Sequence, residues 1–183
     1  MNRDGERICS ESKLKICGFN FEERPDATEH FKAMKLSFNK RVWSIRHLKR
    51  AGFKGADLLK LYESLVRPVL DFCVPAYHSL LSAEQSGELE KMQSRVLKLI
   101  NDGGDNFEIE SLQERRKRLI DKFALKIANS PLFSERWLKI KNRNNYGTRK
   151  EEKYEIKRAK TRRMQRNPLN YITMRLNELH YER

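Results

Sequence analysis

The residues that could perform chemistry are few and scattered in this chain of 183 residues. Asp102 and Asp105 form a close carboxylate pair, but they flank two glycines, and Asp and Gly in such a run usually form a turn. Polymerases and nucleases need carboxylates that converge on two metal ions, which this pair alone does not indicate. The histidines lack an orienting partner for a nucleophile and are interpreted as surface or packing residues. They are His30, His47, His78 and His180. The sequence therefore predicts no catalytic residue, no metal site and no cofactor.

The cysteines and the hydropathy of the chain indicate the cellular compartment in which the protein is expected. Cys9, Cys17 and Cys73 are an odd, unclustered set without a CxxC pair, so we expect free thiols in a reducing compartment. No apolar run reaches the roughly 18 residues that a transmembrane helix requires. The polar residues 1–11 lack the apolar region of a signal peptide. The sequence therefore predicts an intracellular protein.

The chain is strongly basic, with 39 Lys and Arg residues against 25 Asp and Glu residues and a formal net charge of +14. Such a charge favours a polyanionic partner, because cationic side chains that neutralise phosphates release counterions. An anionic membrane surface is the competing partner. We expect RNA and DNA as partners rather than a membrane or a small-molecule substrate.

The elements that must position these charges are mostly helical. With 8 Gly and 5 Pro, long stretches are free of residues that break helices. We expect a kink at Pro68 and a break near Pro75. Asp26 or Thr28 can cap the first helix, and Ser82 the third. Apolar residues at three- and four-residue steps predict helices over residues 28–51, 56–66, 82–100, 108–129 and 169–179.

The expected fold is mainly α: a bundle of four or more helices with a short N-terminal strand and a basic, flexible C-terminal segment. Residues 14–21 alternate apolar and polar with a slip at Gly18, which predicts a short strand with a bulge or a tight bend at Gly18 and without a convincing partner. Residues 132–138, with Phe133 and Trp137, are expected to form a lid on the bundle. The chain divides into a disordered terminus (1–13), the strand region (14–24), the bundle (25–138), a basic linker (139–167) and a C-terminal helix (168–183).

The linker and two of the helices carry the candidate nucleic-acid contacts. Residues 139–166 hold 12 Lys and Arg against three acids, and the run 157–163 is typical of a nuclear-import or nucleic-acid patch. A solvated surface is the alternative interpretation for every charged helix face. Trp43, Trp137 and Tyr77 could stack on bases, but their apolar neighbours favour packing. The candidates are Lys32, Lys35, Arg46, Lys49 and Arg50 in the first helix, Arg115, Arg116 and Arg118 in the fourth, and Lys157, Arg158, Arg162 and Arg163 in the linker.

Several stretches carry a resemblance to a known family. Residues 57–72 combine a leucine-rich segment with Leu65-Val-Arg-Pro-Val-Leu-Asp-Phe72, followed by Val74-Pro-Ala-Tyr-His78. Residues 89–100 read Leu-Glu-Lys-Met-Gln-Ser-Arg-Val-Leu-Lys-Leu-Ile, and residues 112–126 have an arginine-rich start. Together with residues 19–30, these stretches resemble the segment that follows the palm in LINE-type, non-LTR retrotransposon reverse transcriptases. The resemblance covers about residues 14 to 180.

The resemblance implies RNA-templated DNA synthesis by a two-metal site in a palm domain. Its catalytic aspartates would lie upstream of Leu14, so we expect that this chain alone does not copy nucleic acid. The helical bundle would hold the minor-groove side of a primer–template duplex, with the basic face of the first helix along the phosphates. Ile16, Cys17, Gly18 and Phe19 would correspond to the primer grip, where the family usually has Leu-Gly in place of Cys17-Gly18.

Two other functions remain open at this point. A stand-alone helical protein that binds RNA or DNA without sequence preference would show salt-sensitive binding and a stable isolated fold. An interaction domain with a basic tail would show no affinity for nucleic acid at physiological salt.

Overall fold

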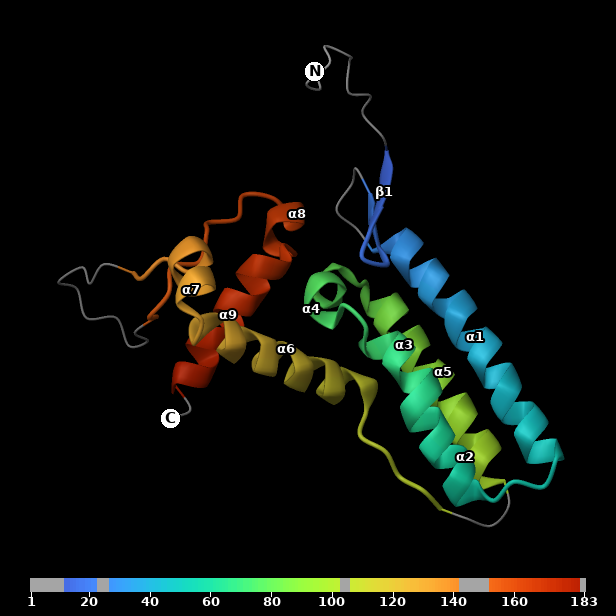
Figure 1. Ribbon diagram of the computed structural model, residues 1–183. Coiled ribbons are helices and arrows are strands. Elements are labelled where there is room, and N and C mark those ends of the chain that lie inside the picture. The colour runs from blue at the N-terminus through green and yellow to red at the C-terminus, as the bar shows by residue number, and fades with distance from the viewer. Residues whose placement is uncertain (1–11, 23–26, 103–105, 142–151, 182–183) are drawn as a thin grey trace.

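The computed structural model describes residues 12–22, 27–102, 106–141 and 152–181. The described chain is mainly helical, with one short antiparallel sheet near its N-terminus, as the sequence predicts. Three roughly antiparallel helical segments form a bundle, and a second group of helices extends from one end of it (Figure 1). The two groups share one continuous cluster of buried apolar side chains.

The N-terminal strand has a partner, which corrects the prediction of a strand without one, and the slip at Gly18 is a tight bend rather than a bulge. Strands β1 (Lys13–Ile16) and β2 (Phe19–Glu22) pair antiparallel, with Ile16 opposite Phe19. The connecting residues Cys17 and Gly18 both have positive φ, +48° and +84°. Two such residues make the tight turn whose twist matches a hairpin. The slip in the apolar alternation therefore marks a chain reversal, and Phe19 anchors the hairpin with only 6% of its surface exposed.

Helix α1 (Thr28–Arg50) has the predicted extent but not the predicted cap. Thr28 lies inside the helix, Asp26 lies outside the described residues, and Ala27 is the N-cap residue. The carboxylate of Glu22 instead accepts a hydrogen bond of 2.7 Å from the Glu29 backbone N–H. This bond satisfies a donor at the helix start and ties β2 to α1. Gly52, with φ +90°, follows the helix end as glycine at that position often does.

The second helical segment corrects the prediction of a kink at Pro68. Helix α2 (Gly55–Leu61), a π-helical turn η1 (Tyr62–Val66) and helix α3 (Arg67–Asp71) follow one another directly. Proline lacks an N–H and clashes with the carbonyl one α-turn earlier, and the wider π turn before Pro68 relieves that conflict. The π turn is closed by a hydrogen bond from the Arg67 N–H to the Tyr62 carbonyl. The helical direction therefore continues through the proline to Asp71.

The break expected near Pro75 falls at Cys73, two residues before it. Cys73 has a left-handed backbone with φ +56°, and Pro75 lies in the first turn of helix α4 (Val74–Tyr77). A 3-10 turn, η2 (His78–Leu80), leads to helix α5 (Ala83–Asn101). Ser82 caps α5 as predicted, through a reciprocal pair of hydrogen bonds with Gln85 of 3.0 Å and 2.8 Å.

One apolar face from each of the three segments forms the core of the bundle. Each of these side chains is almost completely buried, and burial of one such side chain stabilises the fold by about 1.5–3 kcal/mol. The α1 face consists of Phe31, Met34, Phe38, Val42 and Ile45, the middle segment contributes Leu58, Tyr62, Val66 and Leu70, and α5 contributes Leu89, Met92, Val96 and Ile100.

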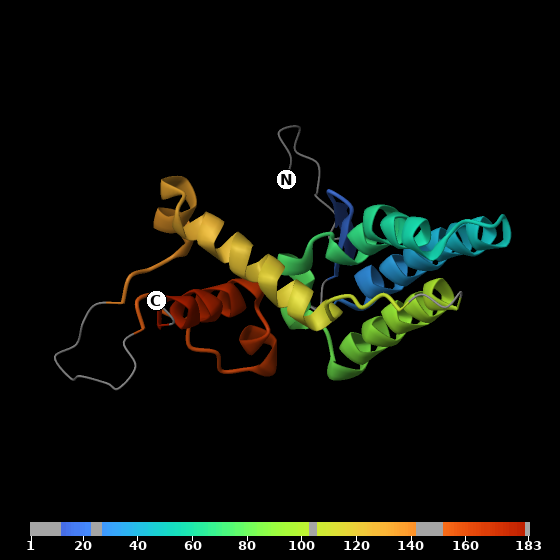
Figure 2. The same cartoon turned by 90° about the horizontal axis from the view of Figure 1, so that it is seen from below.

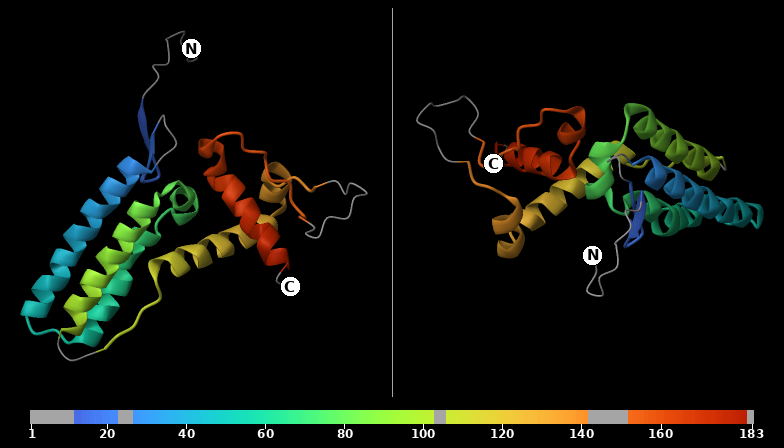
Figure 3. Two further views of the ribbon diagram at one scale, coloured as in Figure 1. Left: turned by 180° about the vertical axis from the view of Figure 1, so that it is seen from behind. Right: turned by 90° about the horizontal axis from the view of Figure 1, so that it is seen from above.

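Helix α6 (Leu112–Ala128) leaves the bundle, and helix α9 (Pro168–Tyr181) packs across it (Figures 2 and 3). Ile172 and Leu176 of α9 are buried, so the C-terminal helix packs on the preceding helices α4 and α6. Helix α6 starts later than predicted, because Ser111 caps it by accepting from the Glu114 N–H.

Two predictions for the C-terminal third need correction. Helix α7 (Pro131–Trp137) leaves Phe133 and Trp137 each 41% exposed, so it does not form an apolar lid on the bundle. The described parts of the linker make specific contacts: a β-bridge joins Ile140 to Tyr154, and helix α8 spans Arg162–Gln165. A wholly flexible linker over residues 139–167 is therefore incorrect for these parts.

Candidate nucleic-acid interface

The outer face of α1 is the strongest candidate interface in the described structure. The sequence has no acidic residue between Glu29 and Asp57, while eight Lys and Arg residues lie in that interval. With 3.6 residues per turn, Lys32, Arg46 and Arg50 lie on one side of the helix, about 110° around it from the centre of the core face. All three side chains are exposed. We call this surface, with Lys40 beside it, the basic face: Lys32, Lys40, Arg46 and Arg50.

Two predicted members of this face have a different role. Lys35 forms an ion pair with Glu88 of α5. The ammonium group of Lys49 donates to the Leu99 carbonyl at 2.6 Å and to an Asp102 carboxylate oxygen at 3.0 Å. Both lysines therefore hold α1 against α5. In contrast, Lys40, Arg46 and Arg50 have no hydrogen bond or ion pair with any residue that the structure describes.

Sequence reasoning weighed base stacking by Trp43 but favoured packing, and it did not single out Leu36. Trp43 is 60% exposed and Leu36 is 65% exposed, so packing of Trp43 in the core is incorrect. The Trp43 and His47 rings lie 3.8 Å apart between centroids. The spacing of Trp43 from Lys32 and Arg50 is the signal that could have placed it outside. Tyr77, by contrast, is fully buried as predicted.

The three arginines of α6 each have a partner within the fold. Arg115 forms a bidentate pair with Asp71 of α3, at 2.7–3.0 Å, and this pairing raises the pKa of Arg115. Arg118 pairs with Glu110 just before the helix. Arg116 is 1% exposed and donates to the Ser86 hydroxyl at 2.7 Å. A buried guanidinium cannot reach a strand that binds from outside, so Arg116 is removed from the candidate interface.

The hairpin and the C-terminal run stand apart from the basic face. Of the residues that resemble a primer grip, Ile16, Cys17 and Gly18 are exposed and Phe19 is buried. The Gly18 turn lies against Phe72, whose ring atoms are 3.3 Å from the position that a Cβ on Gly18 would take. Lys157 and Arg158 are exposed, and the backbone near them is held because Asn170 of α9 donates to the Lys157 carbonyl. Arg162 and Arg163 lie in α8, and their side chains are outside the described set.

The buried histidines fit a packing role. Burial lowers the pKa of His30, and burial together with the Arg116 charge lowers the pKa of His78 to about 4. Both rings are therefore neutral at pH 7. The described residues contain no group of three or more His, Cys, Asp or Glu side chains placed to hold a metal ion, and Asp105 lies outside them.

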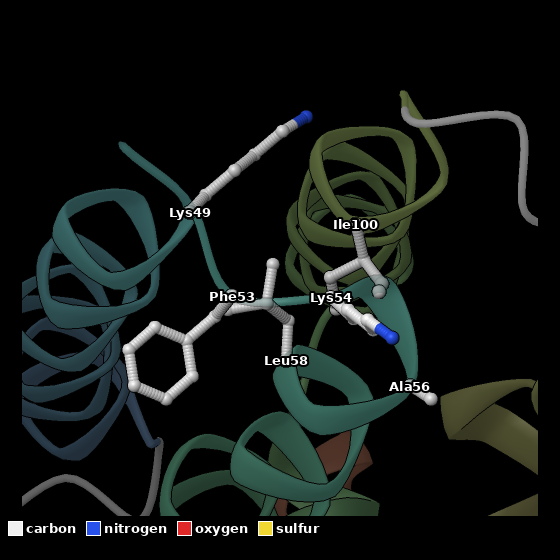
Figure 4. A pocket seen from close by; sticks show the side chains of 7 residues that line it. Lys49, Phe53, Lys54, Ala56, Leu58 and Ile100 are labelled. Carbon is white, nitrogen blue, oxygen red and sulfur yellow. The ribbon is translucent and has the colours of Figure 1, made fainter. Parts of the chain in front are cut away.

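A pocket of about 370 Å³ lies at the end of the bundle where α1, α2 and α5 meet (Figure 4). Phe53, Leu58 and Ile100 line it from three segments, with Lys49 and Lys54 as its charged side chains. No carboxylate lines it, so it lacks the acid–base groups that catalysis by carboxylates would require.

Comparisons with known proteins return nothing: no family model matches this chain, and no curated protein or solved structure gives a significant match. Within the described residues, no helix is both long enough and apolar enough to cross a bilayer. The function proposed below therefore rests on the residues and their arrangement.

Proposed function

We propose that this chain binds nucleic acid through the basic face of α1, as the thumb-like part of a LINE-type reverse transcriptase. The observation that carries the binding proposal is the set of exposed cations on one helix face, with no acid in the sequence from residue 30 to residue 56. Exposed Lys and Arg side chains in one row suit contacts to a phosphate backbone, which position a strand without reading its sequence.

The division of charge within the bundle supports this proposal. Lys35 and Lys49 are neutralised by α5, whereas Lys40, Arg46 and Arg50 lack such partners in the described structure. Like charges along one helix repel each other, and phosphates that bind there would remove that repulsion.

The number of cations gives the expected salt dependence. Lys32 forms an ion pair of 2.9 Å with Glu29, which a phosphate would have to replace. If Lys32 makes this exchange and Lys40, Arg46 and Arg50 each neutralise one phosphate, the slope of log K against log salt is about −3.6 for duplex DNA. Affinity should then fall roughly a hundredfold between about 50 mM and 200 mM salt. Fluorescence anisotropy with a labelled RNA–DNA hybrid would measure this slope.

A matched pair of triple variants tests the location of the interface. K40A/R46A/R50A removes three charges from the basic face, and K117A/K122A/K126A removes three exposed charges from α6. The first variant should bind weakly with a slope near −0.9, while the second should retain most of the wild-type slope. Equal effects of the two variants, with both folded by circular dichroism, would contradict the assignment of the interface to α1.

The reverse-transcriptase part of the proposal rests on the resemblance of residues 57–78 and 89–100 to the post-palm segment. A primer-extension assay with the purified chain should show no nucleotide incorporation. Genomic sequence upstream of this gene should contain a Tyr/Phe-x-Asp-Asp codon run within a few hundred bases, intact or decayed. Without that run, the stand-alone binding protein becomes the better explanation of a salt-sensitive complex.

Nuclear entry is part of the same proposal. Residues 157–163 contain five Lys and Arg residues, and Lys157 and Arg158 are exposed. Short basic runs of this kind can act as import signals. A fluorescent fusion should accumulate in nuclei, and K157A/R158A should reduce that accumulation. Equal distribution of both fusions would contradict nuclear import through this run.

A further inference from the structure

The exposed tryptophan of α1 has no structural role that the described contacts explain. Trp43 lies about 140° around the helix from the centre of the core face, taking 100° per residue. It therefore cannot reach the apolar cluster formed by Val42 and Ile45. Its ring contacts His47, which is itself exposed. A large aromatic side chain exposed on a helix surface is available to stack on the flat face of a partner.

The neighbours of Trp43 indicate the chemistry of that partner. Leu36, Lys40, Trp43 and His47 follow one another at steps of three and four residues, which forms one row along the helix. Lys32, Arg46 and Arg50 form the adjacent row. One row therefore offers a flat aromatic ring, and the other offers cations. A partner that complements both must carry anionic groups beside flat apolar faces.

Unpaired nucleotides have this combination, and duplex nucleic acid does not. In a duplex each base is stacked between its neighbours and presents only its edges to a groove, whereas an unpaired base can stack on an aromatic side chain. A membrane surface is less suitable, because an interfacial helix needs a broad apolar face. Leu36 and Trp43 are the large apolar side chains of α1 that are exposed, and they are separated by Lys40.

We propose that Trp43 stacks on an unpaired base while Arg46 and Arg50 contact the phosphates of the same strand. This inference rests on the proposed nucleic-acid function and refines it. It predicts that α1 prefers single-stranded nucleic acid, or the single strand beside a duplex, over a blunt duplex. Trp43 would then determine the preference, and the cations would supply the salt-dependent affinity.

Fluorescence can report on Trp43 directly, because the chain has two tryptophans, Trp43 and Trp137. In a W137F background, titration with a 12-nucleotide oligo-dT should quench the emission, and a blunt duplex of equal phosphate content should quench it much less. W43A should weaken oligo-dT binding by about fivefold to a hundredfold, the range expected from loss of one stacking contact. W43F should restore much of that loss, and duplex affinity should change less than about twofold.

The same measurements separate failure of this inference from failure of the proposed function. If K40A/R46A/R50A binds oligo-dT and duplex as tightly as the wild type, the basic face does not bind nucleic acid at all. If that variant is weakened but W43A binds oligo-dT like the wild type, the stacking inference alone is overturned. A stronger response of Trp43 emission to anionic vesicles than to oligo-dT would also overturn it. Circular dichroism should show W43A folded, because the side chain lies outside the core.

Discussion

Replacing Asp71 with asparagine removes the charge that holds Arg115, and this change probes the junction between the bundle and α6. The guanidinium donates three hydrogen bonds of 2.7–3.0 Å to the Asp71 carboxylate. Only 19% and 18% of the two side chains remain exposed, so water can replace little of this interaction. Loss of one partner from a fully buried pair costs about 3–5 kcal/mol, and partial exposure lowers our expectation to about 2–3 kcal/mol.

A double-mutant cycle separates the pairing from the general effect of each substitution. Urea unfolding of wild type, D71N, R115M and D71N/R115M should give single losses of about 2–3 kcal/mol in unfolding free energy. The double variant should lose much less than the sum, because it leaves no unpaired charge, with a coupling of about 2 kcal/mol. Additive losses, with a coupling below about 0.5 kcal/mol, would show that the pair does not stabilise this junction.

Three further predictions concern the stability and packing of the fold. The pKa of His78 is about 4 in the folded chain against an ordinary 6.5, so the unfolded chain binds a proton at this residue more readily. The folded state therefore keeps its stability above pH 6.5 and loses part of it as the pH falls toward 4. Urea unfolding at pH 7 and at pH 4.5 gives the fall in unfolding free energy between these two pH values. Because His78 is partly exposed, we expect this fall to be about 2 kcal/mol smaller in H78Q than in the wild type. An equal fall in the two proteins would contradict this prediction. Gly18→Ala should lower the free energy of unfolding by about 2 kcal/mol and Gly52→Ala by about 1 kcal/mol, as measured by thermal unfolding. Both glycines have positive φ, but only at Gly18 would an added Cβ also meet Phe72. Equal losses would argue against the contact between the hairpin and Phe72. In a C9S chain, a short bis-maleimide should link Cys17 to Cys73, because the contact of Gly18 with Phe72 brings the two turns together. Peptide mass spectrometry would detect the linked peptides, and their absence would mean that the hairpin does not pack against Phe72.

Periodicity was sufficient to predict the helices with one apolar face. Residues 28–51 and 82–100 have an unbroken apolar stripe and clear end signals, and α1 and α5 match them closely. The π turn before Pro68 depends on how the chain accommodates a missing N–H, and spacing alone does not distinguish it from a kink. The hairpin was missed because its strands are four residues each, too short for alternation to reveal two strands and a turn.

The site was predictable only where exposure follows from local spacing. On α1 the helical period separates Arg46 and Arg50 from the core face, so the basic row could be read from the sequence. Whether Arg115 and Arg116 are free to contact a phosphate depends on Asp71 and Ser86, which lie 44 and 30 residues away along the chain. Partners at such separations are set by tertiary packing, and a count of charges in α6 contains no information about them.

The contrast between α1 and α6 shows why net charge alone cannot locate an interface. Both helices are rich in Lys and Arg, yet Arg115 and Arg118 are neutralised by carboxylates whereas Arg46 and Arg50 are not, within the described residues. A cation paired inside the fold stabilises the fold, and it must break that pair before it can contact a phosphate. A cation left exposed without an acid nearby contributes repulsion to the free protein and attraction to a polyanion. The cations that best mark a binding surface are therefore those that the fold does not use, and among the described residues Lys40, Arg46 and Arg50, beside the exposed ring of Trp43, are such cations.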